Sequence, residues 1–294
     1  MRKSLALQQQ LGAVFDITFD CEDGAATGDE AAHAQRVAAL ITSDENHHGR
    51  VGVRVHDPAS PHFEQDVQII CAAAAQSLAY LVIPKVESLA QLNAAISVVD
   101  RHAKAAGRAD LPIHVLIETH GALHEVWDIA ALPRVECLSF GIMDFVSAHH
   151  GAIPDTAMRS PGQFRHPLVV RAKLEIAAAC HAHGKIASHN VCTEIRDLSV
   201  VAGDALEASQ TLGYGRMWSI HPDQITPIVT AFAPSAEECE DATAILLAAQ
   251  SAGWGPIQYK AKLHDRASYR YYWTVLQKAK KSGQPLPETA GALM

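Results

Sequence analysis

The sequence has few charged residues and no long apolar run, and both limit what the protein can be. Charged side chains make up 19% of the 294 residues, and the formal net charge is −8. A protein that binds duplex nucleic acid normally presents a basic face, and no cluster of Lys and Arg here is long enough to form one. No window approaches the ~20 apolar residues that a membrane-spanning helix needs. We therefore expect a protein that binds neither nucleic acid nor membrane.

Paired cysteines and common cofactor motifs are also missing. The six cysteines are spread singly, and none forms a Cys-x-x-Cys pair. We find no His-Glu-x-x-His motif, no Gly-x-Gly-x-x-Gly motif and no P-loop, so the sequence gives no sign of these zinc and nucleotide sites. The N-terminal segment lacks the sustained apolar run of a signal peptide. These features predict a soluble, cytoplasmic protein without disulfide bonds.

Short apolar segments rich in β-branched residues alternate with longer helical patterns along most of the chain. An alternation of roughly 30 residues per unit predicts parallel strands joined by crossover helices. The predicted strands are residues 14–20, 51–55, 80–84, 113–118, 135–141, 185–188 and 217–220. The clearest predicted helices between them are residues 67–76, 89–106, 168–183 and 195–211.

This pattern predicts an α/β fold, a TIM-type (β/α)8 barrel with a C-terminal helical extension. Seven strands are found where a closed barrel has eight, so either the first strand is missing from the start of the chain or the barrel has an open seam. After Phe232 the pattern changes, and two further helices are expected over residues 236–252 and 268–281. The expected domains are a catalytic barrel over residues 1–232 and the extension over residues 233–294.

Charged residues gather where the predicted strands end. The C-terminal ends of parallel barrel strands meet at one face, where active sites lie. Charge at the end of an apolar strand is costly unless it is paired or bound to a metal. We therefore treat this face as the candidate active site. Its charged residues are Asp20, Glu22, Asp23, Arg54, Lys85, Glu118 and Asp144.

Glu118 and Asp144 form the most informative pair. Each is a lone carboxylate at or just past the end of an apolar strand, and the two strands follow one another. Two carboxylates suit Mg²⁺, which prefers oxygen ligands and leaves positions for water and substrate. The alternative is that each residue only caps a helix in its strand-to-helix loop.

Arg54 and Lys85 are the two cations among these residues. A guanidinium at the rim of a barrel can bind a carboxylate or an oxyanion through two parallel hydrogen bonds. Arg54 could equally form a salt bridge to the acidic residues after the first strand. Lys85 could be a Schiff-base lysine, an electrostatic group or an ordinary surface lysine, and we favour the electrostatic role because nothing marks it as desolvated.

Six segments, taken in order, resemble one family, the HpcH/HpaI aldolase and citrate lyase β-subunit superfamily. Its CitE-like branch, which includes malyl-CoA and citramalyl-CoA lyases, is the most similar. The resemblance covers roughly residues 12–232. The segments are Asp20-Cys21-Glu22-Asp23-Gly24, Arg54, Pro84-Lys85-Val86-Glu87, Ile117-Glu118, Phe140-Gly141-Ile142-Met143-Asp144 and Ile220-His221-Pro222-Asp223-Gln224-Ile225.

The resemblance implies a site and a reaction. Mg²⁺ would bind Glu118 and Asp144, and Arg54 would face the substrate oxygens. The reaction would be the reversible cleavage of a hydroxyacyl-CoA, such as citramalyl-, malyl- or citryl-CoA, into an acyl-CoA and an oxo acid. A metal and a guanidinium would stabilise the enolate oxygen that develops. The candidate substrate-binding residues are Arg54, Lys85, Glu22 and Asp23.

The general base is expected from the C-terminal extension. In lyases of this type an aspartate from a neighbouring subunit's C-terminal segment is the candidate, and Asp265 lies at the matching place. Its alternative role is the N-cap of the helix predicted from residue 268. The resemblance therefore also implies a homotrimer or hexamer in which the extension packs on a neighbour.

Two other functions stay open. The first is a pyruvate-type aldolase that acts on free 4-hydroxy-2-oxo acids without CoA. The second is a non-catalytic CitE-like paralogue that serves assembly, which the missing first strand suggests. A further departure is the segment Ala187-Ser188-His189-Asn190, where the family commonly has an aspartate.

Overall fold

The computed structural model of the chain describes residues 1–25 and 27–293. It divides them into two compact units, Met1–Ile228 and Val229–Met294. No helix within these described residues is long and apolar enough to cross a membrane.

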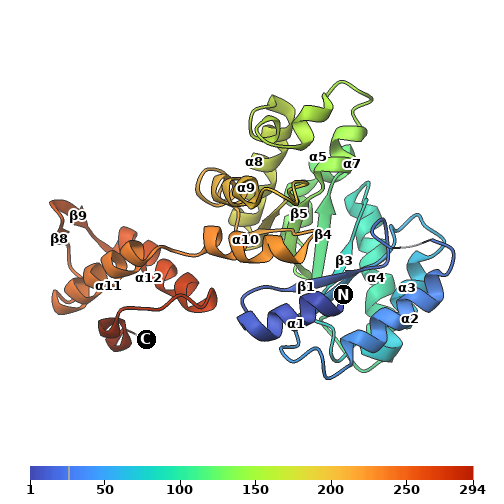
Figure 1. Cartoon of the computed structure of the whole chain (residues 1–294), viewed down its shortest axis with the longest axis horizontal. Coiled ribbons are helices and arrows are strands. Elements are labelled where there is room, and N and C mark those ends of the chain that lie inside the picture. Colours follow the sequence, from blue (N-terminus) through green and yellow to red (C-terminus); the bar gives the residue numbers. More distant parts are fainter. Residues whose placement is uncertain (26, 294) are drawn as a thin grey trace. The chain divides into compact units, whose positions relative to one another are not determined.

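The first unit is built on a parallel sheet of seven strands, hydrogen bonded in chain order (Figure 1). Each predicted strand is confirmed to within a few residues. Several strands, including β4, are apolar and buried on both faces, as expected of a parallel sheet. The strands are β1 (Ile17–Asp20), β2 (Val51–Arg54), β3 (Leu81–Ile83), β4 (Ile113–Ile117), β5 (Val135–Phe140), β6 (Ile186–His189) and β7 (Arg216–Met217).

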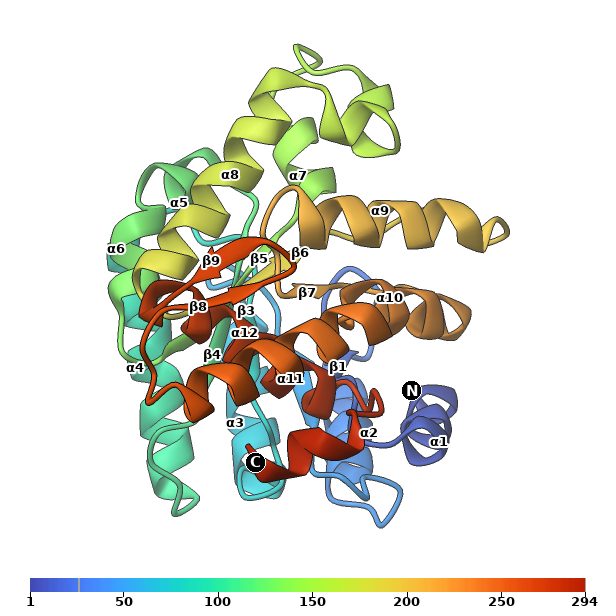
Figure 2. The ribbon, with the colours of Figure 1, turned by 90° about the vertical axis from the view of Figure 1, so that its left-hand side faces the viewer.

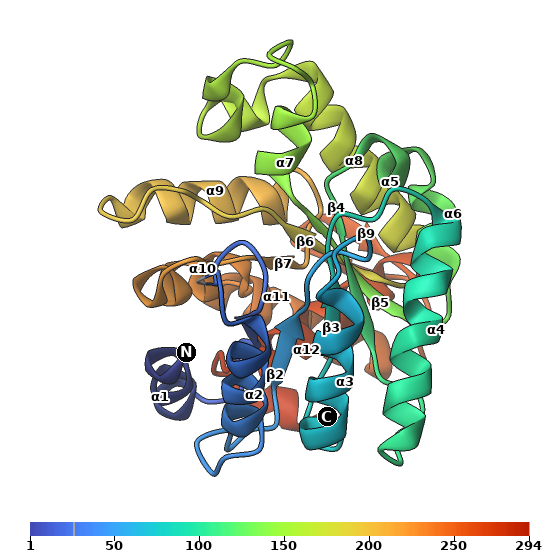
Figure 3. The same ribbon diagram turned by 90° about the vertical axis from the view of Figure 1, so that its right-hand side faces the viewer.

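Helices join the strands and lie along the sheet (Figures 2 and 3). Helices α2, α3 and α4 contact one another in series, and α8 contacts both β5 and β6. The helices are α1 (Arg2–Leu11), α2 (Glu30–Ile41), α3 (Phe63–Ala74), α4 (Leu89–Ala105), α5 (His120–His124), α6 (Val126–Ala131), α7 (Ile142–Ser147), α8 (Pro167–Ala182), α9 (Leu198–Gln210) and α10 (Ile225–Phe232), with short 3₁₀ helices η1 (Asp155–Met158), η2 (Gly162–Phe164) and η3 (Pro222–Gln224).

Local capping sets where several of these helices begin. Ser88 accepts a hydrogen bond from the Gln91 amide at the start of α4, and Thr119 caps α5 in the same way. Thr119 directly follows Glu118, so the cap that starts α5 also fixes the chain just past the end of β4. These two caps therefore help to hold the chain past the ends of β3 and β4, where Lys85 and Glu118 lie.

The sheet curls into part of a barrel, and its two edge strands are linked by side chains. Within the described residues β1 and β7 are not hydrogen bonded to each other, so these residues form no closed eight-stranded barrel. Asp16, just before β1, accepts a hydrogen bond from Arg50 at 2.5 Å and is paired with Arg216 of β7. Helix α1 also contacts η3, which follows β7. Of the predicted fold, the curled parallel α/β sheet is confirmed.

One face of the sheet, called the inner face here, carries Tyr80, Val82 and Leu116 packed together, with Trp218 against them. Gly52 of β2 leaves room for the Tyr80 ring, because a Cβ there would lie 2.2 Å from Tyr80 Cε2. The same face carries the site described below.

The second unit has its own apolar core between two helices, α11 (Ala236–Ser251) and α12 (Arg266–Lys281). Both predicted helices are confirmed. The sequence pattern missed the antiparallel hairpin between them, formed by β8 (Ile257–Tyr259) and β9 (Lys262–His264). A last 3₁₀ helix, η4, spans Glu288–Ala292.

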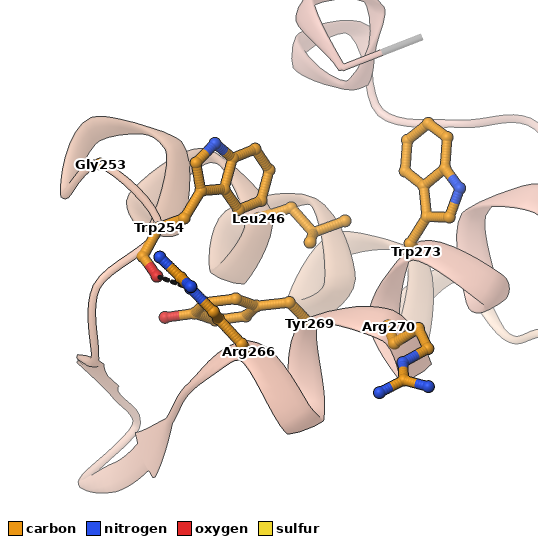
Figure 4. A pocket seen from close by; sticks show the side chains of 7 residues that line it. All are labelled: Leu246, Gly253, Trp254, Arg266, Tyr269, Arg270 and Trp273. Atoms are coloured by element: carbon orange, nitrogen blue, oxygen red, sulfur yellow. Dashed lines mark hydrogen bonds between the residues drawn. The ribbon is translucent and has the colours of Figure 1, made fainter.

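A pocket of about 480 Å³ lies on this unit (Figure 4). Leu246 stands between the indoles of Trp254 and Trp273, and the Arg270 guanidinium points away from them (Figure 4). The lining contains no carboxylate and none of the predicted site residues, so this pocket lacks the metal-binding groups that the sequence predicts. The lining residues are Leu246, Gly253, Trp254, Arg266, Tyr269, Arg270 and Trp273.

Candidate active site

Arg54 is held rigidly at the end of β2. It lies opposite Asp20 in the register of β1 and β2. Its Nε and Nη2 donate to the two Asp20 carboxylate oxygens at 2.8 and 2.5 Å, and its Nη1 lies 2.9 Å from Glu22 Oε2. Burial alone would raise the pKa of Asp20, but the Arg54 hydrogen bonds and charge hold it below its ordinary value. The salt bridge foreseen as an alternative for Arg54 is therefore present, and it fixes the guanidinium in place.

The acidic segment after β1 is a tight turn around the Asp20 carboxylate. The amides of Glu22 and Gly24 donate to it at 3.0 and 2.9 Å. A Cβ on Gly24 would lie 2.3 Å from Asp20 Oδ2, so only glycine allows this close approach. Asp20 thus serves to position the turn and Arg54.

Lys85 joins three strand ends through its backbone and its side chain. Its backbone has φ 49°, a left-handed conformation unusual for lysine, and its amide donates to Glu118 Oε1 at 2.7 Å. Its Nζ lies 2.6 Å from Glu22 Oε1 and 2.7 Å from Asp23 Oδ2. Partial burial lowers the pKa of Lys85, but hydrogen bonds to Asp23 and Glu22 outweigh burial and raise it above its ordinary value. A lysine held protonated is a poor nucleophile, which argues against a Schiff base.

Glu118 is buried directly past the end of β4, with 3% of its surface exposed. Burial, together with the nearby charges of Asp144 and Glu22, raises its pKa to about 8. Asp144 lies in the first turn of α7, and within the described residues its carboxylate makes no hydrogen bond or ion pair. The structure therefore brings these two carboxylates within electrostatic reach of each other, and the charge of Lys85 also reaches Asp144.

Gly141 makes room for Glu118. A Cβ at this position would lie 2.1 Å from Glu118 Oε2 and 2.6 Å from Glu118 Cβ. The end of β5 thus approaches the Glu118 side chain more closely than any other residue would allow. This glycine is part of the family-like segment, and its packing against Glu118 explains why that position of the segment is a glycine.

The two carboxylates fit a hard divalent ion. Within the described residues no three His, Cys, Asp or Glu side chains are placed to hold a metal by themselves. Mg²⁺ does not need such a cage, because it commonly takes one or two carboxylates and keeps water or substrate oxygens in its other positions. Burial and the charges of Asp144 and Glu22 disfavour the ionised form of Glu118, and a bound cation would stabilise that form. Glu118 and Asp144 are the residues that would hold it.

The structure gives two residues contacts that the sequence did not predict. The Trp218 ring lies 5.9 Å from the Arg54 guanidinium carbon, and its Nε1 donates to Ser139 at 3.0 Å. Gln224, the last polar residue of the family-like segment after β7, is fully buried and donates to the carbonyls of Cys192 and Glu194 at 2.9 and 2.8 Å. The sequence placed Trp218 inside the predicted strand 217–220 and gave no signal for its contact with Arg54.

Asp265 lies in the second unit, apart from the residues above along the chain. Its carboxylate accepts a hydrogen bond from the Ala267 amide at 2.9 Å and forms a capping box with Ser268 at the start of α12. The alternative role foreseen for Asp265 as a helix cap is therefore present. A cap and a base are compatible, because the carboxylate is exposed.

Comparisons with known proteins identify the fold and the family. The chain is 59% identical to a citrate lyase from Burkholderia xenovorans LB400 of known crystal structure, with a TM-score of 0.90 over 99% of this chain and 92% of that one. It is 28% identical to the L-malyl-CoA/β-methylmalyl-CoA lyase of Cereibacter sphaeroides over 95% of this chain and 91% of the relative. The CitE protein of Mycobacterium tuberculosis, crystallised with magnesium, acetoacetate and coenzyme A, shares the fold at 23% identity, with a TM-score of 0.72 over 95% of each chain.

The matched residues include every charged residue of the site in the first unit. The family model for HpcH/HpaI aldolase/citrate lyase matches residues 5–222, which run from α1 to η3. The resemblance seen in the sequence is thus confirmed, and the chain belongs to the HpcH/HpaI aldolase/citrate lyase family.

Proposed function

We propose that the protein is a Mg²⁺-dependent carbon–carbon lyase that cleaves a hydroxyacyl-CoA to an acyl-CoA and an oxo acid. The observation that carries this proposal is the pair Glu118 and Asp144, two carboxylates close enough to repel, with Arg54 fixed nearby. Family membership and the likeness to citrate and malyl-CoA lyases support the reaction class. Bound Mg²⁺ would act as a Lewis acid on the substrate oxygens.

The residues of the chain would bind and orient the substrate. Asp20 and Glu22 hold the Arg54 guanidinium, so it can face a carboxylate or enolate oxygen without first losing side-chain entropy. Lys85 orients Glu118 through its amide, and its charged Nζ adds positive potential beside Glu22 and Asp23. Glu22 and Asp23 are engaged by Lys85, so we assign them a positioning role at the edge of the substrate site.

We further propose that the curled sheet is a TIM-type barrel with an open seam, and that the chain works as a homotrimer or hexamer. Residues 233–294 would pack on a neighbouring subunit and present Asp265 as the general base that accepts the substrate hydroxyl proton. Light scattering tests the assembly, and a monomer would remove Asp265 as a base acting between subunits.

The deciding experiment compares two substrate classes with Mg²⁺ present. Citramalyl-CoA and malyl-CoA are set against free 4-hydroxy-2-oxo acids, and acyl-CoA and pyruvate are measured. We expect release of acyl-CoA from the thioesters, and its loss in Glu118→Ala and Asp144→Ala. Pyruvate from the free acids alone would favour the aldolase. If both variants kept wild-type Mg²⁺ affinity and activity, the assignment of the metal site to Glu118 and Asp144 would be wrong. A wild-type protein that is inactive on every substrate would favour the non-catalytic paralogue.

A further inference from the structure

An aspartate–histidine pair lies just past the end of β2, on the strand that carries Arg54, and is not used by the mechanism above. Asp66 Oδ2, on α3, lies 2.6 Å from His56 Nδ1 and also accepts the His56 backbone amide at 3.1 Å. His56 follows Arg54 by two residues, just past the end of β2. The pair therefore belongs to the same edge of the sheet as the charged site.

The burial of the pair differs sharply between its two members. The Asp66 side chain is 1% exposed, and its other oxygen, Oδ1, is buried without a hydrogen-bond partner among the described residues. The His56 side chain is 17% exposed. A buried carboxylate that orients a partly open imidazole is the arrangement in which histidine acts as an acid–base group.

The geometry also fixes which ring nitrogen is available. An ionised carboxylate only accepts hydrogen bonds, so His56 Nδ1 carries the proton that is shared with Asp66. The other nitrogen, Nε2, then has the lone pair in the neutral ring and can accept or donate a proton. Within the described residues Nε2 has no hydrogen-bond partner. The nearest aromatic ring is that of His62, 5.2 Å away between centroids.

We propose that the Asp66–His56 pair transfers the proton at the substrate carbon in the lyase reaction. This proposal rests on the function proposed above. Cleavage breaks the carbon–carbon bond and leaves a thioester enolate, while the hydroxyl proton goes to the general base. The enolate carbon then takes a proton from Nε2 of the His56 imidazolium, which gives the neutral acyl-CoA and a neutral imidazole. In the condensation direction Nε2 removes that carbon-bound proton.

The pair acts on a different atom from the base proposed in the second unit. Asp265 would handle the proton on the hydroxyl oxygen, and His56 the proton on the carbon. Loss of His56 should therefore slow turnover and also slow deuterium exchange at the acyl-CoA carbon, whereas substrate and Mg²⁺ would still bind. Asp66, which does not touch the substrate, acts as a positioning residue for the ring.

The test uses His56→Asn and Asp66→Asn in the full-length protein, with His102→Gln as the matched control. His102 also faces a carboxylate, Glu64 at 3.4 Å, but on the outer helices α4 and α3. We expect His56→Asn to lower kcat about 100- to 1000-fold, the usual range for a general acid–base group, with KM and Mg²⁺ affinity within about threefold of wild type. Asp66→Asn should lower kcat at least about tenfold, and the control less than about twofold.

Two measurements keep a folding defect apart from a chemical one. Exogenous imidazole should restore part of the activity of His56→Gly. ¹⁵N NMR of the histidine rings in the wild type should find His56 protonated at Nδ1 when neutral. A His56 ring protonated at Nε2, or a folded His56→Asn protein with wild-type kcat and deuterium exchange, would overturn the dyad and leave the lyase intact. Absence of lyase activity in the wild type would overturn both proposals.

Discussion

Replacing Glu118 by Gln should stabilise the metal-free protein at pH 8 and remove its response to Mg²⁺. The Glu118 carboxyl has an ordinary pKa of 4.5, which burial and the charge of Asp144 raise to about 8 in the folded protein. A carboxyl whose pKa is raised by folding stabilises the fold most at a pH below the pKa that it has in the unfolded chain. That contribution is lost as the pH rises through about 8. At pH 8 the ionised Glu118 side chain therefore destabilises the metal-free folded state.

The size of the effect follows from the shift in pKa. Each unit is worth about 1.4 kcal/mol, so ionising Glu118 at pH 8 costs the fold roughly 4 kcal/mol. Gln keeps an oxygen that accepts the Lys85 amide, but its own NH₂ group loses about 1–2 kcal/mol if it finds no partner. The net gain is about 2–3 kcal/mol, which corresponds to a rise in Tm of roughly 5–10 °C for a unit of this size.

Thermal melting at pH 5 and pH 8, in chelator and with excess Mg²⁺, measures this. At pH 5 both proteins carry a neutral side chain at residue 118, so the variant should gain nothing there and melt slightly below the wild type, by the about 1–2 kcal/mol of its unpaired NH₂ group. At pH 8 the variant should melt higher in chelator, and Mg²⁺ should raise the Tm of the wild type only. Glu87→Gln, which removes an exposed carboxylate from the segment after β3, is the control. If Glu118→Gln melts below the wild type at pH 8 without metal, the electrostatic reasoning is wrong.

Three other changes test the surroundings of the pair. Gly141→Ala should lower Mg²⁺ affinity about 10- to 100-fold by calorimetry, because the new Cβ must displace Glu118; unchanged affinity would contradict that packing. Arg54→Lys should lower kcat/KM about 100-fold in the lyase assay, since lysine cannot keep both hydrogen bonds to Asp20, and a loss below threefold would argue against a fixed guanidinium. Asp265→Ala should lower the free energy of unfolding by about 1 kcal/mol in a urea titration, through loss of the capping box; no change would show that the cap contributes little.

The sequence predicted those features of the fold that depend on local pattern. The strands are short β-branched runs, and the charged residues at their ends were expected to meet because parallel strands end at one edge. Arg54, Lys85 and Glu118 are indeed joined through Glu22 and the Lys85 amide. Their positions followed from topology alone, although their roles in catalysis still need the experiments above.

Other features depend on contacts that no local pattern records. Asp16 and Arg216, which link the two edges of the sheet, are 200 residues apart in the chain. The hairpin of the second unit turns at Lys260 and Ala261, which have φ 45° and 60° without the Gly or Asn that usually marks such a turn. His56 and Asp66 are separated by only ten positions, but nothing in their spacing distinguishes a dyad from a loop contact.

The division of labour between His56 and Asp265 can be tested by mixing subunits. Suppose that Asp265 acts from a neighbouring subunit. A His56→Asn subunit then lacks the imidazole that protonates the substrate carbon, but it still offers a normal Asp265 to its neighbour. An Asp265→Ala subunit has a normal His56, so a hybrid assembly contains some sites with both groups.

Co-expression of the two inactive variants should then restore measurable lyase activity, whereas separately purified variants mixed without subunit exchange should not. If both groups serve the same site from one chain, no hybrid site has both, and the co-expressed protein should stay as inactive as its parents. That result would place the base within the subunit and contradict the proposed role of residues 233–294 in completing a neighbour's site.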